Sequence, residues 1–250
     1  MQPFDGIPLS PRRRIGGMPL LLFLLAAVGA VAALVVGPLY LERLRRELTR
    51  TEELHAIADR LGLRFIAGDP AFPASTAQRH PFELFSRGVD QTCENFLVGT
   101  LGGFEVLAFD FLYRQRVDSD GAPENDVHSE PIRTSCAIVT IAGDRAHVVI
   151  EPAGSDLTAR ADGEPVRLEW GDFNTRYRVV SADRAFVTAL LDLGLMAWLV
   201  DEAPRLAVTW ELQRDEVLCR ARGLAPRDVE LVIRALPEFA RRVGRGAAGT

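Results

Sequence analysis

The sequence predicts an α+β fold, in which an N-terminal transmembrane helix is followed by a mainly antiparallel β domain with two flanking helices. Three observations predict it. Residues 19–41 carry no charged side chain, and short β-type runs separated by Gly and Asp turns begin near residue 94. Two apolar patterns with helical spacing follow, over 181–201 and 226–243.

The apolar run from Met18 to Leu41 is long enough to cross a bilayer. Its 24 residues span about 36 Å as a helix, against a hydrocarbon core of about 30 Å. Residues 1–17, which include three consecutive Arg, are expected to be a disordered basic tail. Such a start also suits a signal peptide, but the run exceeds the usual apolar length of about 7–15 residues. We therefore expect an uncleaved anchor at 18–41.

Residues 42–62 are predicted to form a stalk helix that docks on the domain and ends at Gly62, the residue type favoured just past a helix. The domain then occupies 63–243, and 244–250 is a disordered tail. The predicted apolar row of the stalk is Leu41, Leu44, Leu48, Leu54, Ile57, Ala58 and Leu61.

Alternating apolar residues and turn residues predict four pairs of strands within the domain. The expected pairs are 96–100 with 104–113, 134–141 with 146–150, 166–170 with 176–180, and 206–212 with 216–222. The first, second and fourth pairs read as hairpins, around Gly102-Gly103, Gly143-Asp144 and Arg214-Asp215. The third pair flanks a corner over 171–174.

The two flanking helices have recognisable starts. Ser181 is expected to cap a helix that continues to Asp201, and Pro226 lies in the first turn of the last helix. Pro237 is expected to kink or restart that last helix, because its ring removes an internal hydrogen bond. The predicted buried face of the last helix is Val229, Val232, Ile233, Leu236, Phe239, Ala240 and Val243.

Charge is unevenly distributed along the chain. All 29 basic residues are arginine, and with 34 acidic residues they give a net charge of −5. Residues 1–50 hold seven Arg and three acids, a net +4, so residues 51–250 carry −9. An acidic domain repels phosphate backbones, which argues against nucleic acid as a partner. The basic flanks of the span suit anionic head groups, and the bilayer is the partner expected for 18–41.

Three cysteines, Cys93, Cys136 and Cys219, lie far apart in apolar stretches. Three thiols cannot all pair within one chain, so a disulfide framework is not expected, and small buried side chains are. Reduced thiols favour a cytoplasmic domain. The count of Arg beside the span, three before it and four after it, barely favours that orientation.

No motif assigns a catalytic residue, a cofactor or a metal. No phosphate-binding loop, dinucleotide-binding Gly pattern or nucleophile elbow occurs in the sequence. Asp126, His128 and Glu130 would share one face of an extended chain, but in a polar acidic loop we read them as solvated. His147 lies within an apolar strand and is expected to be a hydrogen-bonded structural histidine.

Aromatic residues around two acidic positions have a structural explanation. Phe109 and Phe111 bury one strand face while Asp110 points to the other. Asp172 and Asn174 suit a corner, since their side chains cap local backbone groups. An enzymatic role would instead require Asp110, Asp172 and Arg176 to converge in one pocket.

An ordered series of short phrases carries a resemblance over roughly residues 20–243. The phrases are Gly68-Asp69-Pro70, Phe82-x-x-Phe85-Ser86-Arg87-Gly88, Asn95-x-Leu97-x-Gly99, Phe109-Asp110-Phe111, Asp172-Phe173-Asn174, Tyr177-Arg178-Val179, Asp183, Leu190-Leu191-Asp192 and Met196-x-Trp198-Leu199. In them the chain resembles a group of uncharacterised single-pass membrane-anchored proteins of actinobacteria. The resemblance implies an N-terminal anchor and a cytoplasmic α+β domain, and implies no activity.

Three functions are therefore open. The sequence favours a membrane-tethered, non-enzymatic binding or scaffold domain that faces the cytoplasm and binds an unknown ligand or protein partner. The alternatives are a hydrolase-like enzyme whose site assembles from dispersed residues, and a module that senses membrane lipids through an apolar groove or a basic concave surface.

Overall fold

A computed structural model describes residues 18–68, 77–115, 131–155 and 163–246, with the side chains of 18–35, 245 and 246 excepted. The expected tail at 1–17 and the set Asp126, His128 and Glu130 lie outside these residues. The chain divides into two units, Met1–Thr49 and Arg50–Thr250. The second unit holds the sheet.

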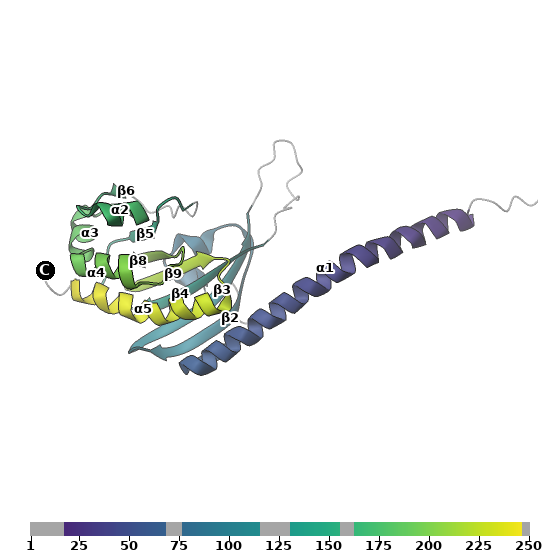
Figure 1. The fold of residues 1–250 in the computed structure, drawn as a ribbon, viewed down its shortest axis with the longest axis horizontal. Coiled ribbons are helices and arrows are strands. Elements are labelled where there is room, and N and C mark those ends of the chain that lie inside the picture. The colour runs from purple at the N-terminus through teal and green to yellow at the C-terminus, as the bar shows by residue number, and fades with distance from the viewer. Residues whose placement is uncertain (1–17, 69–76, 116–130, 156–162, 247–250) are drawn as a thin grey trace, which may run out of the picture. The chain divides into compact units, whose positions relative to one another are not determined.

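Helices and strands alternate unevenly along the chain (Figure 1). The helical elements are α1 Met18–Leu61, the 3-10 segments η1 Ala77–Arg79 and η2 Glu83–Ser86, α2 Gly171–Arg176, α3 Arg184–Leu190, α4 Leu193–Ala197, the π-helical turn η3 Trp198–Glu202, and α5 Pro226–Gly246. The strands are β1 Arg64–Ile66, β2 Val89–Leu101, β3 Phe104–Arg114, β4 Ile132–Thr140, β5 Val148–Pro152, β6 Glu164–Val166, β7 Tyr177–Ser181, β8 Thr209–Gln213 and β9 Glu216–Arg222.

Within the described part of the chain, nine strands form one sheet in the order β1-β2-β3-β4-β9-β8-β5-β7-β6. Each neighbouring pair is antiparallel. The predicted α+β class with a mainly antiparallel sheet is confirmed. More helical segments flank the sheet than the two that the sequence predicts.

Two of the three predicted hairpins are confirmed and one is wrong. β2–β3 turns at Gly102-Gly103 and β8–β9 turns at Arg214-Asp215, where Arg214 has a positive φ of 56°. β4 and β5, however, do not pair with each other. The β8–β9 hairpin lies between them, with β9 beside β4 and β8 beside β5. A pairing partner later in the sequence has displaced the local one.

The segment between β6 and α5 differs from the prediction in detail. The expected strand over 166–170 is only the end of β6, and the expected corner is the short helix α2. The single helix expected over 181–201 is divided into α3, α4 and η3, because Asp183 and Asp192 each cap a separate helix start. Ser181 belongs to β7, and its hydroxyl donates to the carbonyl of His147 at 2.7 Å.

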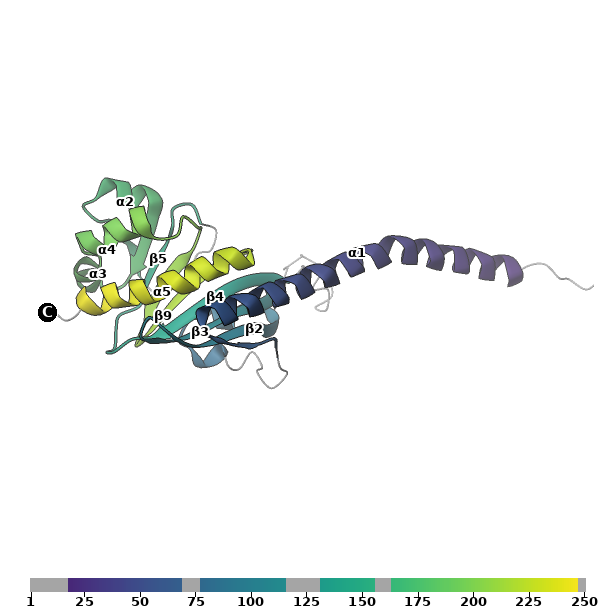
Figure 2. The ribbon, with the colours of Figure 1, turned by 60° about the horizontal axis from the view of Figure 1, so that its bottom comes forward.

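The two faces of the sheet bury two separate clusters, as the period of two along each strand requires. The larger cluster packs α5 and the end of α1 on one face, and both helices lie over that face in Figure 2. The smaller cluster is aromatic and lies on the opposite face beneath η1 and η2. Its members are Ala77, Phe82, Leu84, Phe85, Cys93, Phe96, Phe109, Phe111, Tyr113, Cys136, Ile138 and Leu218.

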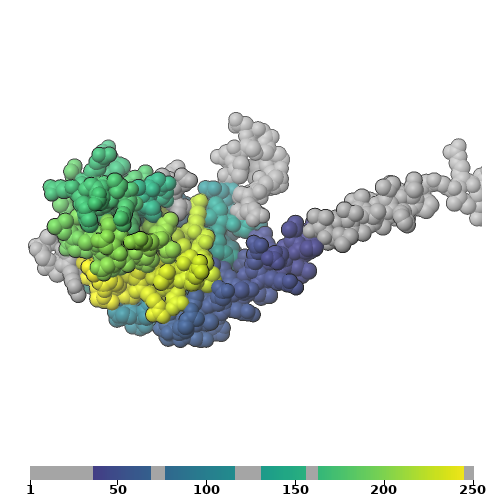
Figure 3. All heavy atoms as spheres, viewed as in Figure 1, coloured from purple at the N-terminus to yellow at the C-terminus, as the bar shows by residue number. Residues whose placement is uncertain are grey.

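The outer side of α5 is exposed between the α3–η3 segment and the last turns of α1, as Figure 3 shows. Arg60 at the end of α1 bonds Glu230 of α5 at 2.6 Å. This bond and a second one from Arg234 lower the pKa of Glu230, outweighing the opposite effect of its partial burial.

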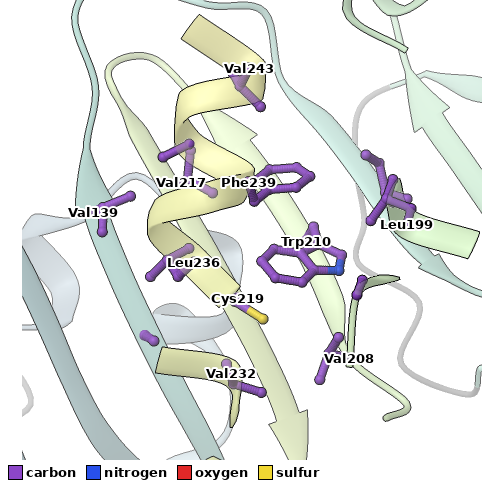
Figure 4. Close-up of a cluster of buried hydrophobic side chains, with 14 of the residues drawn as sticks. Val139, Leu199, Val208, Trp210, Val217, Cys219, Val232, Leu236, Phe239 and Val243 are labelled. Carbon is purple, nitrogen blue, oxygen red and sulfur yellow. The ribbon is translucent and has the colours of Figure 1, made fainter. Parts of the chain in front are cut away.

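The inner side of α5 supplies the centre of the larger cluster. Trp210 stacks on Phe239 with ring centroids 4.5 Å apart (Figure 4). Trp198 packs edge-on against Trp210. All seven residues of the predicted buried face of this helix are buried. The predicted restart at Pro237 is wrong, since α5 continues through it to Gly246.

α1 begins in the first unit, and its last turns belong to the second. Leu54, Ile57, Ala58 and Leu61 are buried as predicted, whereas the predicted row members Leu41, Leu44 and Leu48 are exposed. The helix ends as predicted, because Gly62 adopts a φ of 69° and Leu63 N donates to Ala58 O at 2.9 Å.

The predicted span at 18–41 falls mainly on residues 18–35, whose side chains are not described. Among the side chains that are described, we find no helix with the length and apolar character needed to cross a membrane.

All three cysteines are free and buried, as expected. Burial, with a smaller effect of the Glu94 charge, raises the pKa of Cys93 to about 12, and burial also raises the pKa of Cys136 and of Cys219. At pH 8, only about one in 10⁴ molecules of a thiol with that pKa is ionised, and the thiolate is the reactive form.

We predict that Ellman's reagent labels none of the three thiols rapidly in the folded chain and all three in guanidinium chloride. Rapid labelling of one thiol before unfolding would contradict this burial.

Candidate functional site

The three residues of the hypothetical enzymatic site do not converge. Asp110 lies on β3, whereas Asp172 and Arg176 lie on α2, which leads into β7. Four strands separate β3 from β7 in the sheet. At a strand spacing of about 4.8 Å, that places the two groups roughly 24 Å apart. The hypothesis of a catalytic centre built from these three residues is therefore wrong.

Asp110 instead forms the centre of a buried polar cluster. Arg50 binds it in a bidentate fashion, with Nε 2.8 Å from Oδ2 and Nη2 2.7 Å from Oδ1. Oδ2 also accepts from Asn95 at 3.1 Å and from Arg133 at 3.1 Å, and Oδ1 accepts from the hydroxyl of Ser135 at 2.9 Å. Only 2% of the Asp110 side chain is exposed. We call these five residues the Asp110 cluster.

The Asp110 cluster holds its carboxylate ionised. Burial by itself raises the pKa of Asp110, but the hydrogen bond and charge of Arg50, the charge of Arg133 and the hydrogen bond of Asn95 outweigh burial and lower it. Both oxygens are fully used by these donors, so the group has no free lone pair with which to act as a general base. The chemistry of the cluster is that of a structural ion pair.

Local backbone geometry brings the cluster together. Asn95 lies at an irregularity in the β2–β3 register and has a φ of 56°, which turns its amide toward Asp110. Its Oδ1 accepts from the hydroxyl of Thr51 on α1 at 3.0 Å. Arg50 also donates to the carbonyl of Leu224, just before α5, at 2.6 Å. The cluster thus joins α1, β2, β3, β4 and the start of α5.

Further charges are buried on the opposite face of the sheet. Glu211 on β8 contacts His147 at 2.9 Å and lies 3.4 Å from Arg220 on β9. His147 is therefore partnered, as expected. Glu151 on β5 pairs with Arg178 on β7 in the same way. Among the described residues, no three His, Cys, Asp or Glu side chains lie close enough to hold a metal ion.

Two pockets lie between α2 and the α4–η3 segment. The tryptophan pocket has a volume of about 390 Å³ and is lined by Glu169, Trp170, Leu193 and Ala197. The arginine pocket has a volume of about 330 Å³ and is lined by Arg176, Tyr177, Leu199, Val200, Ala203, Pro204 and Arg205. Both volumes fall at the lower end of the range for small-molecule sites.

The π-helical turn η3 shapes the arginine pocket. Ala203 N bonds the carbonyl of Trp198 at 2.8 Å, five residues earlier, and the helix then ends. The carbonyls of Leu199 and Val200 are left without helical partners. Tyr177 Oη donates to Leu199 O at 3.0 Å, and Arg176 Nη1 donates to Val200 O at 2.6 Å. Burial, opposed in part by the Arg176 charge, raises the pKa of Tyr177, which keeps that hydroxyl protonated.

Asn174 holds the other wall in place, as its predicted corner role requires. Its side-chain amide donates to the carbonyls of Leu168 and Trp170, at 2.7 Å and 2.9 Å, and its Oδ1 accepts from Leu168 N at 3.2 Å. Asp172, by contrast, is exposed at the first turn of α2. The capping role predicted for Asp172 and Asn174 is thus confirmed for Asn174.

Sequence reasoning missed Arg50, Arg133, Ser135 and Arg205. For Arg50 a signal existed, because it falls in register with the apolar row Leu54, Ile57 and Leu61 of its helix. A charged residue on an apolar helix face indicates a buried partner. Nothing in the sequence marked Arg205, since its position depends on the π-helical turn.

Comparison with known proteins gives a likeness at the level of the fold. No protein-family model and no curated protein sequence matches the chain. Among solved structures, it resembles the crystal structure of the mycobacterial trehalose monomycolate transport factor A, TtfA. The TM-score is 0.50 at 13% sequence identity, over 77% of this chain and 94% of that one. At that identity, the likeness shows a shared fold.

Removing Arg50 should destabilise the second unit strongly. Arg50→Ala leaves the carboxylate of Asp110 buried with fewer partners, and breaking such a pair costs about 3–5 kcal/mol. Because Trp170, Trp198 and Trp210 all lie in the second unit, tryptophan fluorescence of the full chain in detergent reports its denaturation by urea. The matched control is Arg234→Ala, which removes an exposed pair with Glu230 and should cost about 0.5 kcal/mol or less. Equal losses in the two variants would contradict a structural role for the Asp110 cluster.

Acid should release the stabilisation that Asp110 provides. A carboxylate whose pKa is lowered in the folded state stabilises it above the unfolded pKa of about 3.9, and this contribution is lost as the pH falls toward the folded pKa. In that window, each pH unit costs about 1.4 kcal/mol per such group. Denaturation measured from pH 5 to pH 2.5 should therefore show a shallower pH dependence in Asp110→Asn than in the unchanged chain. Parallel curves would show that the pKa of Asp110 is not lowered.

Proposed function

We propose that this chain is a membrane-tethered, non-enzymatic binding domain that faces the cytoplasm. Support for the tether comes from the uncharged run at 18–41 and its continuity with α1, which extends from Met18 to Leu61. Val36, Leu39, Tyr40 and Leu41, at the end of this run, are exposed apolar side chains. Lipid around such side chains would remove them from water.

The Asp110 cluster is the observation that carries the proposal. It fastens the helix that continues from the apolar run to three strands of the sheet, through a charge pair that is almost fully buried. A flexible anchor would need no such pair, since an exposed linker suffices to keep a domain near a bilayer. This chain instead builds the end of its anchor helix into the core of the domain.

Binding is favoured over catalysis by the state of the polar groups. The Asp110 carboxylate, Asn95 and Ser135 are buried, and both carboxylate oxygens are occupied by the surrounding donors, so substrate has no access to the carboxylate. The two pockets lie elsewhere. The lining of the tryptophan pocket is mainly apolar, and that of the arginine pocket combines apolar side chains with two arginines. Such pockets bind apolar matter and orient it with few polar groups.

The tryptophan pocket also favours the lipid-sensing alternative as a second candidate. The tryptophan pocket lies beside Leu193, which is 74% exposed, and an exposed Leu at a pocket suits an apolar ligand. The fold is shared with a protein named for transport of trehalose monomycolate. We therefore take an amphiphilic molecule as the ligand that best fits the proposed binding domain.

Membrane extraction tests the tether. Two Arg at the centre of a span cost about 5–7 kcal/mol on the insertion scale, so Leu24→Arg with Val28→Arg should release the chain from membranes washed in alkaline carbonate. Leu24→Ile with Val28→Ile, the matched control, should stay in the membrane pellet. Tryptophan fluorescence of the released variant confirms that its domain is folded. Release of the unchanged chain by carbonate would contradict a tether.

Protease protection tests the orientation. A cytoplasmic domain is degraded in inside-out vesicles and protected in intact spheroplasts. The reverse pattern would place the domain on the other side of the membrane and would leave the tether itself standing.

A further inference from the structure

We propose that the arginine pocket binds the anionic head group, a carboxylate or a phosphate, of a long-chain amphiphile. The inference deepens the proposed binding function by naming the class of ligand. It rests on that function only in taking the chain to lie at a membrane. Its basis is that Arg176 and Arg205 line one pocket together with the apolar residues Leu199, Val200 and Ala203.

The two guanidinium groups have no carboxylate partner among the described residues. Arg176 uses Nη1 on the carbonyl of Val200, and Arg205 is exposed without an ion pair. No acidic residue lines this pocket, and the nearby exposed acids Asp201 and Glu202 are absent from its lining. Guanidinium groups recognise carboxylates and phosphates through two parallel hydrogen bonds.

The Asp110 cluster shows what such an arginine does in this fold. Arg50 donates one Nη1 hydrogen bond to a carbonyl beside a helix end, Leu224 O, at 2.6 Å, and its other nitrogens bind a carboxylate. Arg176 donates Nη1 to a carbonyl at a helix end, Val200 O, also at 2.6 Å. One bond fixes the guanidinium, and the remaining donors are left for an anion. In the arginine pocket, that anion comes from the ligand.

The surrounding surface explains why the anion belongs to an amphiphile. Trp170 and Arg176 stand at opposite ends of α2, so the tryptophan pocket lies about 9 Å along that helix from the arginine pocket. On the α4–η3 side, Ala197 lines the tryptophan pocket and Leu199, two residues later, lines the arginine pocket. A head group at Arg176 and Arg205 lets an acyl chain lie along these residues toward Trp170. A small anion would leave the tryptophan pocket unused.

The π-helical turn supplies an independent reason to place a site here. π-helical turns are rare, and they occur often at functional sites because they displace side chains and carbonyls from the regular helix. Here η3 directs the carbonyls that hold Tyr177 and Arg176. A regular helix would satisfy these carbonyls differently and would not fix the guanidinium.

Fluorescence competition on the full chain in nonionic detergent tests the inference. The probe is palmitate with a fluorophore near the end of its chain, and the competitors are dodecyl phosphate, methyl palmitate and inorganic phosphate. We expect dodecyl phosphate to displace the probe, and methyl palmitate and inorganic phosphate to displace it at least tenfold more weakly. A charge-assisted hydrogen bond is commonly worth that factor or more.

Variants assign the effect to the pocket. Arg205→Gln removes a side chain that has no partner among the described residues, so the fold should persist, and the affinity of this variant for the probe should fall about tenfold. Arg184→Gln, the control, removes an exposed arginine on α3 that lines neither pocket, and its affinity should not change. Unchanged thermal denaturation of both variants, followed by tryptophan fluorescence, shows that they are folded.

Three results would overturn the inference. Methyl palmitate that competes as well as dodecyl phosphate would show that the head-group charge is not recognised. Inorganic phosphate that competes equally well would indicate a free-anion site without a role for the chain. Equal affinity of Arg205→Gln and Arg184→Gln would place binding elsewhere. None of these outcomes depends on carbonate extraction, so a failed tether and a failed ligand class are distinguishable.

Discussion

The buried pair of Arg50 and Asp110 is the interaction on which the arrangement of the domain depends. Taking both charges out of water is costly, and only close geometry with additional hydrogen bonds offsets that cost. Here the carboxylate accepts hydrogen bonds from four side chains, one on α1, one on β2 and two on β4. These donors come from three segments that are distant in the sequence. The pair therefore requires the last turns of α1, three strands and Leu224, just before α5, to meet in one arrangement.

Local features of the fold could be predicted from the sequence, and long-range ones could not. The hairpins β2–β3 and β8–β9 follow from alternating residues and their turns, and the buried face of α5 follows from its period. The Gly143-Asp144 turn carried the same kind of signal, yet β4 and β5 separate to admit β8 and β9. Turn residues indicate where the chain reverses direction locally, whereas the order of strands in the sheet depends on which pairs of strands bury more surface.

The candidate sites show the same limit. Asp110 was recognisable as an acid between aromatics, and Arg50 as a charge in an apolar helical row, but 60 residues separate them. Only the register of three strands and a helix shows that they meet. The arginine pocket was harder still, because Asp192 divides a helix that the apolar period presents as continuous. A composition with arginine as its sole basic residue makes the forked guanidinium available at both places.

The position of the β8–β9 hairpin has a consequence for how the domain is made. Within the described sheet, it joins the half formed by β1–β4 to the half formed by β5–β7, yet it comes from residues 209–222, after all the other described strands in the sequence. During synthesis, the early strands must wait for it, and contacts between distant segments form slowly. An apolar run at 18–41 has meanwhile left the ribosome long before. The domain therefore completes its sheet only after residues 209–222 have been synthesised, well after the apolar run at 18–41.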